Sequence, residues 1–194
     1  MREVFHQNLK IVSDQLVELT HLAGSAMSRA TTALIDADLA LAESVITADQ
    51  RIDEVRAELD ALAIDLLARQ QPVAGDLRMV VTSMRMSSDL ERMGDLARHI
   101  AKVARLRYPN SAVPAELRAT IVEMGHIAEE LVAKAGSVIA SRDIVAAQEL
   151  EHDDDAMDAK HRELFTRLAD KWTRGTTAAV DITLLGRYYE RFGD

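Results

Sequence analysis

Apolar residues recur along this chain at alternating steps of three and four, the spacing that places one buried stripe along an α-helix. No stretch of the sequence shows the strict alternation of apolar and polar residues that is typical of a half-buried strand. Short segments with proline, glycine or capping carboxylates separate the helical stretches. The pattern therefore predicts an all-α fold with six long helices, at residues 6–35, 38–70, 76–107, 115–140, 143–171 and 177–194.

The strongest interruption of the pattern lies between Tyr108 and Pro114 and contains two of the chain's three prolines. Proline has no amide hydrogen to donate within a helix, and its ring obstructs the preceding turn, so this segment ends one helix before the next begins. It divides the six predicted helices into two groups of three. We therefore predict two units, residues 1–107 and 108–194.

The two units repeat one sequence pattern, which is typical of tandem structural repeats. Residues 36–42 align with residues 141–147 at an offset of 105, and the same offset superimposes an Asp-x-x-x-Asp pair in each unit. Further along, Glu-Arg-Met-Gly-Asp at 91–95 aligns with Glu-Arg-Phe-Gly-Asp at 190–194, at an offset of 99 that a shorter loop explains. The repetition predicts two pseudo-symmetric three-helix bundles in tandem. Its acidic residues are Asp49, Asp53, Glu91 and Asp95 in the first unit and Asp154, Asp158, Glu190 and Asp194 in the second.

Each acidic pair places two carboxylates on one helix face, about 6 Å apart along the axis. Like charges at this spacing weaken a helix by roughly 0.2–0.5 kcal/mol unless a cation neutralises them. One candidate cation is the arginine beside each glutamate, Arg92 or Arg191. The other is a metal ion, because four carboxylates from adjacent helices offer the oxygen ligands that Mg²⁺, Mn²⁺, Fe or Zn²⁺ bind. We predict these eight acidic residues as metal ligands.

The apolar stripe also predicts where the acids point. On the second helix the stripe runs through Ala48 and Ile52, so Asp49 and Asp53 fall beside it. The acids of the third helix fall beside its stripe in the same way. We therefore expect carboxylates at the surface or shoulder of each bundle rather than in its core. The glycine within each Glu-Arg-x-Gly-Asp motif costs roughly 1 kcal/mol in a helix relative to alanine, and it indicates close approach of either a ligand or a neighbouring helix.

The composition argues against several classes of protein. The 194 residues include no cysteine, so disulfides and thiolate metal sites are excluded and a reducing compartment is expected. The net charge of −9 argues against a nucleic-acid partner, which needs a basic surface. No apolar run is long enough to span a bilayer, and the first residues lack the apolar core of a signal peptide. We expect a protein that meets a membrane only through partner proteins.

The tandem helical organisation and the two copies of the acidic motif together resemble the PhoU family of phosphate-signalling proteins. The segment 72–78, which leads into the third helix, is similar to that family as well. The resemblance implies metal ions held on the surface of two three-helix bundles by the acidic motifs. It also implies a cytoplasmic negative regulator of phosphate uptake and of the phosphate-starvation response, which binds the ATPase of a phosphate ABC importer and a phosphate-sensing histidine kinase. We expect such a protein to form a homodimer.

We favour a regulator that acts by binding over an enzyme, and two alternatives stay open. One is a metal-dependent carboxylate-bundle enzyme, which would need an open coordination position and a general base near the metal. The other is a helical adaptor whose acids bind no metal. Of the two predicted metal sites we favour the first, because the sequence stops at the motif of the last helix and helix ends fray.

Overall fold

The computed structural model describes residues 2–170 and 172–194. These residues form helices and connecting turns with no strand among them, so the predicted all-α fold is confirmed. Residue 171, the last of the predicted helix 143–171, lies outside the described residues. The helices are α1 (Arg2–Asp36), α2 (Leu39–Gln70), α3 (Ala74–Arg107), the short 3-10 helix η1 (Ala115–Leu117), α4 (Arg118–Ser141), α5 (Ile144–Asp153), α6 (Asp155–Ala169) and α7 (Gly175–Gly193).

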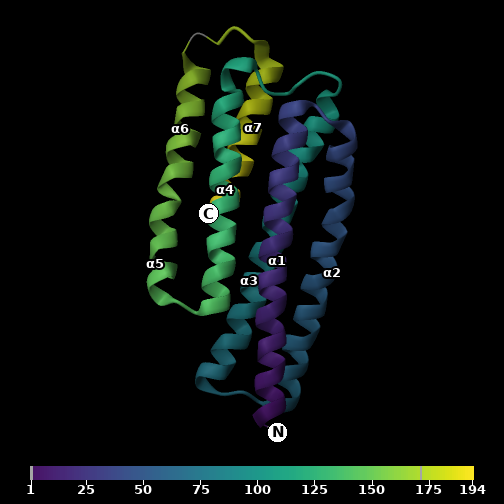
Figure 1. The fold of residues 1–194 in the computed structure, drawn as a ribbon, viewed down its shortest axis with the longest axis vertical. Helices are drawn as coiled ribbons and strands as arrows, with labels where there is room; N and C mark the ends of the chain where they lie inside the picture. Colours follow the sequence, from purple (N-terminus) through teal and green to yellow (C-terminus); the bar gives the residue numbers. More distant parts are fainter. Residues whose placement is uncertain (1, 171) are drawn as a thin grey trace.

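The prediction of one continuous helix over 143–171 is wrong at one residue. Helix α5 ends at Asp153 and α6 begins at Asp155, with Asp154 in a turn between them. Asp154 keeps near-helical dihedral angles, φ −68° and ψ −25°, and its carbonyl oxygen still accepts a hydrogen bond of 3.2 Å from the Asp158 amide. The two segments therefore continue as one rod, at the left of Figure 1, and the described residues form six long rods.

The turn before the second rod is the same in both units. Ala37 and Arg142 both adopt the left-handed conformation, with φ of 52° and 58°. The residue that follows caps the next helix: the Asp38 carboxylate accepts an amide hydrogen bond of 3.0 Å, and the Asp143 carboxylate accepts one of 2.9 Å. Such a carboxylate satisfies a helix N–H that would otherwise lack a partner. These positions differ by 105, so the repeated sequence folds into a repeated backbone.

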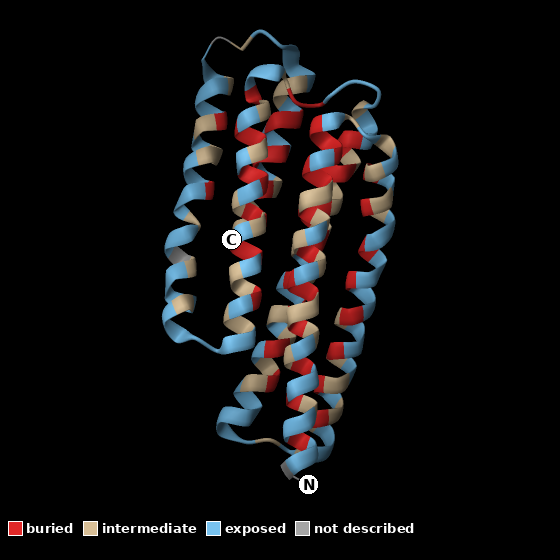
Figure 2. Ribbon diagram, viewed as in Figure 1, coloured by how far each residue is buried: buried red, intermediate tan, exposed pale blue. Residues whose placement is uncertain are grey.

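The six rods lie along one long axis (Figure 1). Helices α1, α3, α4 and α7 are central, and α2 and the α5–α6 rod flank them on opposite sides. An apolar core shared by both units includes Met27 on α1, Ile100 on α3, Met124 on α4 and Phe192 on α7. A second apolar cluster fills the rest of the space between α1, α2 and α3. Figure 2 shows the buried residues on the facing sides of the central rods, whereas the α5–α6 rod is mostly exposed.

The two units meet closely where α1 packs against α4. A Cβ atom placed on Gly136 would lie 2.5 Å from Oγ1 of Thr20, and one placed on Gly125 would lie 2.7 Å from Cγ2 of Thr31. Glycine therefore lets these helix backbones approach more closely than any side chain would permit. The Thr31 hydroxyl also lies 2.8 Å from the buried hydroxyl of Tyr189 on α7. This contact extends the junction from α1 to the last helix.

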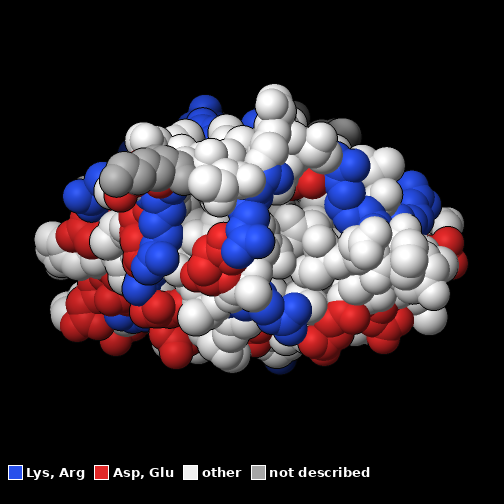
Figure 3. Space-filling view, turned by 90° about the horizontal axis from the view of Figure 1, so that it is seen from above, with Lys and Arg blue, Asp and Glu red and all other residues white. Residues whose placement is uncertain are grey.

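Ion pairs add to the junction between the units. Arg107, at the end of α3, donates from Nε and Nη2 to the two carboxylate oxygens of Asp181 on α7, at 2.6 and 3.0 Å. Asp181 is buried, so this pair is shielded from water. Figure 3 shows the end of the molecule that carries the 108–114 loop, where Lys and Arg side chains lie among Asp and Glu. The pairs at this end include Arg174 with Glu116, at 2.7 Å.

Candidate functional site

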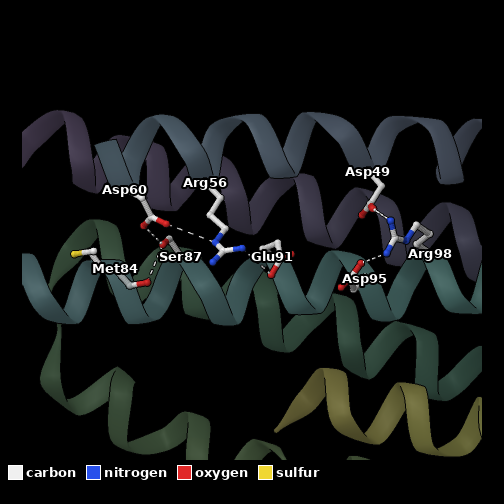
Figure 4. A network of polar contacts seen from close by, with 8 residues as sticks. All are labelled: Asp49, Arg56, Asp60, Met84, Ser87, Glu91, Asp95 and Arg98. Atoms are coloured by element: carbon white, nitrogen blue, oxygen red, sulfur yellow. Dashed lines mark hydrogen bonds and ion pairs between the residues drawn. The ribbon is translucent and has the colours of Figure 1, made fainter. Parts of the chain in front are cut away.

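The four acids predicted for the first unit lie between α2 and α3, and we call them the first cluster. Asp49 and Asp53 come from α2, and Glu91 and Asp95 come from α3. The guanidinium of Arg98, also on α3, stands between the two helices (Figure 4). Its Nη1 lies 2.7 Å from Oδ2 of Asp49, and its Nη2 pairs with Asp95. The first cluster therefore contains its own cation.

The expectation that Asp49 lies beside the apolar stripe is wrong. Asp49 is 6% exposed, whereas Ala48 is exposed to solvent. The buried stripe of α2 includes Asp49 and Ile52, whereas the predicted stripe ran through Ala48 in place of Asp49. Two registers fit the sequence because α2 packs against both α1 and α3 and so buries a wide face. The other three acids of the first cluster are partly or fully exposed, as expected.

Burial and neighbouring acids raise the pKa of two acids of the first cluster, Asp49 and Glu91. Burial raises the pKa of the Asp49 carboxyl above its ordinary value of 3.8, the Arg98 guanidinium opposes this rise, and two neighbouring acids add to it. Burial also raises the pKa of Glu91, with Arg56 opposing the rise and the other three acids adding to it. Since Asp53 and Asp95 act on both Asp49 and Glu91, the fold has brought the four predicted residues into one electrostatic neighbourhood.

Two arginines that the sequence did not single out form ion pairs with acids of the first cluster. Besides Arg98, Arg56 on α2 reaches across to Glu91 on α3, with 3.5 Å between Nη1 and Oε2. Arg92, the expected partner of the cluster, is exposed instead. One signal for Arg98 was present in the sequence, because it follows Asp95 by three residues and that spacing favours an ion pair on one helix face.

The second cluster lies between the α5–α6 rod and α7. Its central feature is Asp154, whose Oδ1 is buried and has no hydrogen-bond partner among the described residues. A Cβ atom placed on Gly193 would lie 2.6 Å from this oxygen. Gly94 has the equivalent place in the first cluster, with its Cβ position 3.3 Å from Oδ1 of Asp49. Both motif glycines thus allow a helix backbone to approach an aspartate. The acids of this cluster are Asp154, Asp158, Glu190 and Asp194.

The arginines near the second cluster bind acids on their own helix. Arg187 pairs with Glu190, and Arg191 pairs with Asp194 at 2.9 Å, as the sequence suggested for Arg191. Burial raises the pKa of Asp154 above its ordinary value of 3.8, and the other three acids of the cluster raise it further. Among the residues that the structure describes, no ion pair of Asp154 offsets these effects.

The second cluster opens onto a groove of about 630 Å³ between α3, α4, α5 and α7. The lining combines apolar side chains such as Met93 and Leu131 with charged ones such as Arg92 and Asp154. The end of α7 beside it is hydrogen-bonded rather than frayed, because the Asp194 amide donates to the carbonyl oxygen of Glu190 at 3.1 Å. The groove is open to solvent, so ions in solution have access to the second cluster.

The two clusters differ in how well they fit a metal ion. Within residues 2–170 and 172–194, no group of three or more His, Asp or Glu side chains already surrounds one position. In the first cluster, Arg98 stands where a metal shared by Asp49 and Asp95 would stand, so these residues do not fit one without rearrangement. In the second cluster, the buried oxygen of Asp154 needs a partner that a cation would supply. Metal binding by the eight acids stays a prediction.

Comparison with known proteins gives the relationship of the chain. A family model, PhoU domain, matches residues 16–104 and 121–194, on either side of the 108–114 loop. The chain belongs to the PhoU family. Similar relatives include phosphate-specific transport system accessory protein PhoU homolog 2 of Mycobacterium tuberculosis, which is 49% identical over 195 residues that cover 100% of this chain and 92% of the relative. PhoU homolog 1 of Mycobacterium leprae is 48% identical, with 100% and 88% covered.

A solved structure of the PhoU family shares the fold. PhoU from Pseudomonas aeruginosa superimposes with a TM-score of 0.85 at 28% identity, over 97% of this chain and 91% of that one. The expected membership of the PhoU family is therefore confirmed by sequence and by structure. None of the described helices combines the length and hydropathy that crossing a membrane requires.

Proposed function

We propose that this PhoU family member is an accessory regulator of phosphate transport that acts by binding other proteins. The observation that carries the proposal is its 49% identity, along the whole chain, to a phosphate-specific transport accessory protein. In this proposal its partners are the ATPase of a phosphate ABC importer and a phosphate-sensing histidine kinase. It works in the cytoplasm as a homodimer, and it represses phosphate uptake and the starvation response when phosphate is plentiful.

The position of the acids supports docking over catalysis. Asp53 and Asp158 are exposed, and the second cluster faces a groove that is open to water. Metal-assisted catalysis gains from a shaped and dry cavity, which this surface does not resemble. Exposed carboxylates instead attract cations and the basic side chains of a partner. In this proposal, bound Fe, Zn, Mn or Mg ions join neighbouring helices and shape the docking face.

A pull-down from phosphate-replete cells tests the proposal. We expect the wild-type protein to recover the importer ATPase and the kinase, and a protein with both Asp53→Asn and Asp158→Asn to recover less of each. Glu130→Gln is the matched control, because it neutralises an exposed acid on α4 outside both clusters. Recovery of neither partner by the wild-type protein would contradict the proposal. Light scattering tests the homodimer, whose mass is twice the 21.4 kDa of one chain.

A further inference from the structure

We propose that Arg98 is a resident cation that keeps metal ions out of the first cluster, so that the second cluster is the metal site of this protein. The inference rests on the proposed metal-binding role and assigns it to one of the two units. Three observations carry it: the position of Arg98 between two helices, the burial of Asp49, and the unpartnered oxygen of Asp154.

Arg98 binds two helices with its two terminal nitrogens. Nη1 forms an ion pair with Asp49 on α2, 2.7 Å from Oδ2, and Nη2 donates a hydrogen bond to Oδ1 of Asp95 on α3. A guanidinium is planar and keeps its charge throughout the pH range of folded proteins, so here it acts as a fixed monovalent cation. A metal ion bound by both carboxylates would need the same oxygens and the same space (Figure 4).

Burial makes Arg98 hard to displace. Asp49 is 6% exposed, and the side chain of Arg98 is only 29% exposed. Salt and water screen such a partly buried pair weakly, and hydrogen bonds between two charged groups are the strong ones. A metal ion would have to separate Arg98 from both Asp49 and Asp95 before it bound. A guanidinium that stayed nearby would then repel it.

The second cluster offers a cation the opposite conditions. Asp154 stands 105 residues after Asp49, as its counterpart, but its buried Oδ1 has no hydrogen-bond partner among the described residues. Arginines stand beside both clusters, so the presence of positive charge does not distinguish the clusters. Their placement does, because Arg187 and Arg191 bind acids of their own helix from positions that are 53% and 38% exposed. Surface ion pairs of this kind contribute little and yield readily.

Titration of the metal-free protein with Mn²⁺ tests the inference, with unbound Mn²⁺ counted by electron paramagnetic resonance. We expect the wild-type protein to bind Mn²⁺ at one cluster. Arg98→Met removes the charge but keeps a long side chain, and we expect it to bind additional Mn²⁺. Affinity at the first cluster should rise roughly tenfold or more, which corresponds to about 1.4 kcal/mol. Arg105→Met is the matched control, because it removes the same charge from an exposed position on α3 and should bind as wild type does.

Aspartate substitutions assign the sites. In the wild-type background, Asp154→Asn should abolish Mn²⁺ binding and Asp49→Asn should leave it unchanged. In the Arg98→Met background, the additional Mn²⁺ should disappear when Asp49→Asn is added and persist when Asp154→Asn is added. If circular dichroism shows that Arg98→Met does not fold, Arg98→Gln takes its place, because glutamine still donates a hydrogen bond but carries no charge.

Either of two results would overturn the inference. One is that the Arg98 variant binds no more Mn²⁺ than the wild-type protein, and the other is that Asp49→Asn removes Mn²⁺ from the wild-type protein. These outcomes are separate from the docking test. A protein that recovers the importer ATPase but shows no effect of Arg98 would keep the proposed function and lose this inference. A protein that shows the expected Mn²⁺ pattern but recovers neither partner would keep this inference and lose the proposed function.

Discussion

The two acid clusters share a sequence motif and differ in what satisfies their carboxylates. In the first, Arg98 and Arg56 reach between α2 and α3 and pair with Asp49 and Glu91. In the second, the counterpart of Asp49 is Asp154, whose buried oxygen has no partner among the described residues. The two copies of the motif therefore carry the same acidic residues, but the basic residues around them differ. Arg56 and Arg98 lie outside the motif, and they supply the positive charges that pair with Glu91 and Asp49.

The largest expected effect comes from removing the resident cation of the first cluster. Arg98→Met leaves Asp49 buried without its ion pair, and losing one partner of a buried pair costs about 3 kcal/mol. Urea unfolding of the metal-free protein should show this loss, whereas Arg105→Met should unfold within about 0.5 kcal/mol of the wild-type protein. Adding Asp49→Asn to Arg98→Met should restore most of the stability. Equal stability of Arg98→Met and the wild-type protein would show that Arg98 does not hold the cluster together.

The two motif glycines should respond differently to alanine. A Cβ at position 94 would lie 2.6 Å from Cδ1 of the fully buried Ile52, so Gly94→Ala should cost about 1–3 kcal/mol through overpacking. A Cβ at position 193 would instead lie 2.6 Å from a carboxylate oxygen of Asp154 in the second cluster. Gly193→Ala should therefore reduce Mn²⁺ binding more than stability. Unfolding and Mn²⁺ titrations of both variants measure this. A Gly94→Ala protein of wild-type stability, or a Gly193→Ala protein that loses stability but binds Mn²⁺ as wild type does, would contradict this difference between the clusters.

A smaller effect is expected at the outer part of the first cluster. Arg56 and Glu91 are partly exposed and 3.5 Å apart, so Arg56→Gln should cost about 0.2–1 kcal/mol. The loss should shrink as salt is added, because exposed charges are screened more strongly than buried ones. Unfolding at low and high salt measures this. A loss as large as that of Arg98→Met would mean that the buried position of Asp49 does not set the first cluster's stability.

The smallest effect should have the opposite sign. Burial and neighbouring acids raise the pKa of Asp154, so its charged form destabilises the metal-free fold. Asp154→Asn should then stabilise that protein by roughly 0.2–0.5 kcal/mol, the size of repulsion between like charges one turn apart.

The gain from Asp154→Asn depends on pH in a defined direction. Below the ordinary carboxyl pKa of 3.8 the aspartate is protonated in both the folded and unfolded states, so the substitution changes little. The gain should appear as pH rises through the raised pKa of the folded state and should be complete above it. Thermal unfolding across this range, without metal, measures the gain. A loss of stability at neutral pH would show that Asp154 has a partner that stabilises its charge.

Much of the fold was predictable because several local signals agreed. The apolar period, the prolines near 108–114 and the capping aspartates Asp38 and Asp143 all mark the same helix ends, and the structure places the ends within a few residues of the prediction. The burial of Asp49 was not predictable in the same way. Helix α2 buries a wide face, so the sequence allowed one stripe through Ala48 and another through Asp49. Contact with two neighbouring helices decided between them.

The sequence by itself determined that the chain is helical, that one unit occurs twice, and which acids recur, because these depend on short-range periodicity and on comparison of the chain with itself. Only the tertiary structure decided which cation on one helix meets an acid on another. Arg98 and Asp49 are 49 residues apart and meet because α2 and α3 pack side by side. Asp154 has the equivalent sequence position in the second unit and meets no such partner among the described residues. The arginine that pairs with an acid is the one that lies near it in space. Spacing along the sequence predicts that nearness only when both residues belong to the same helix.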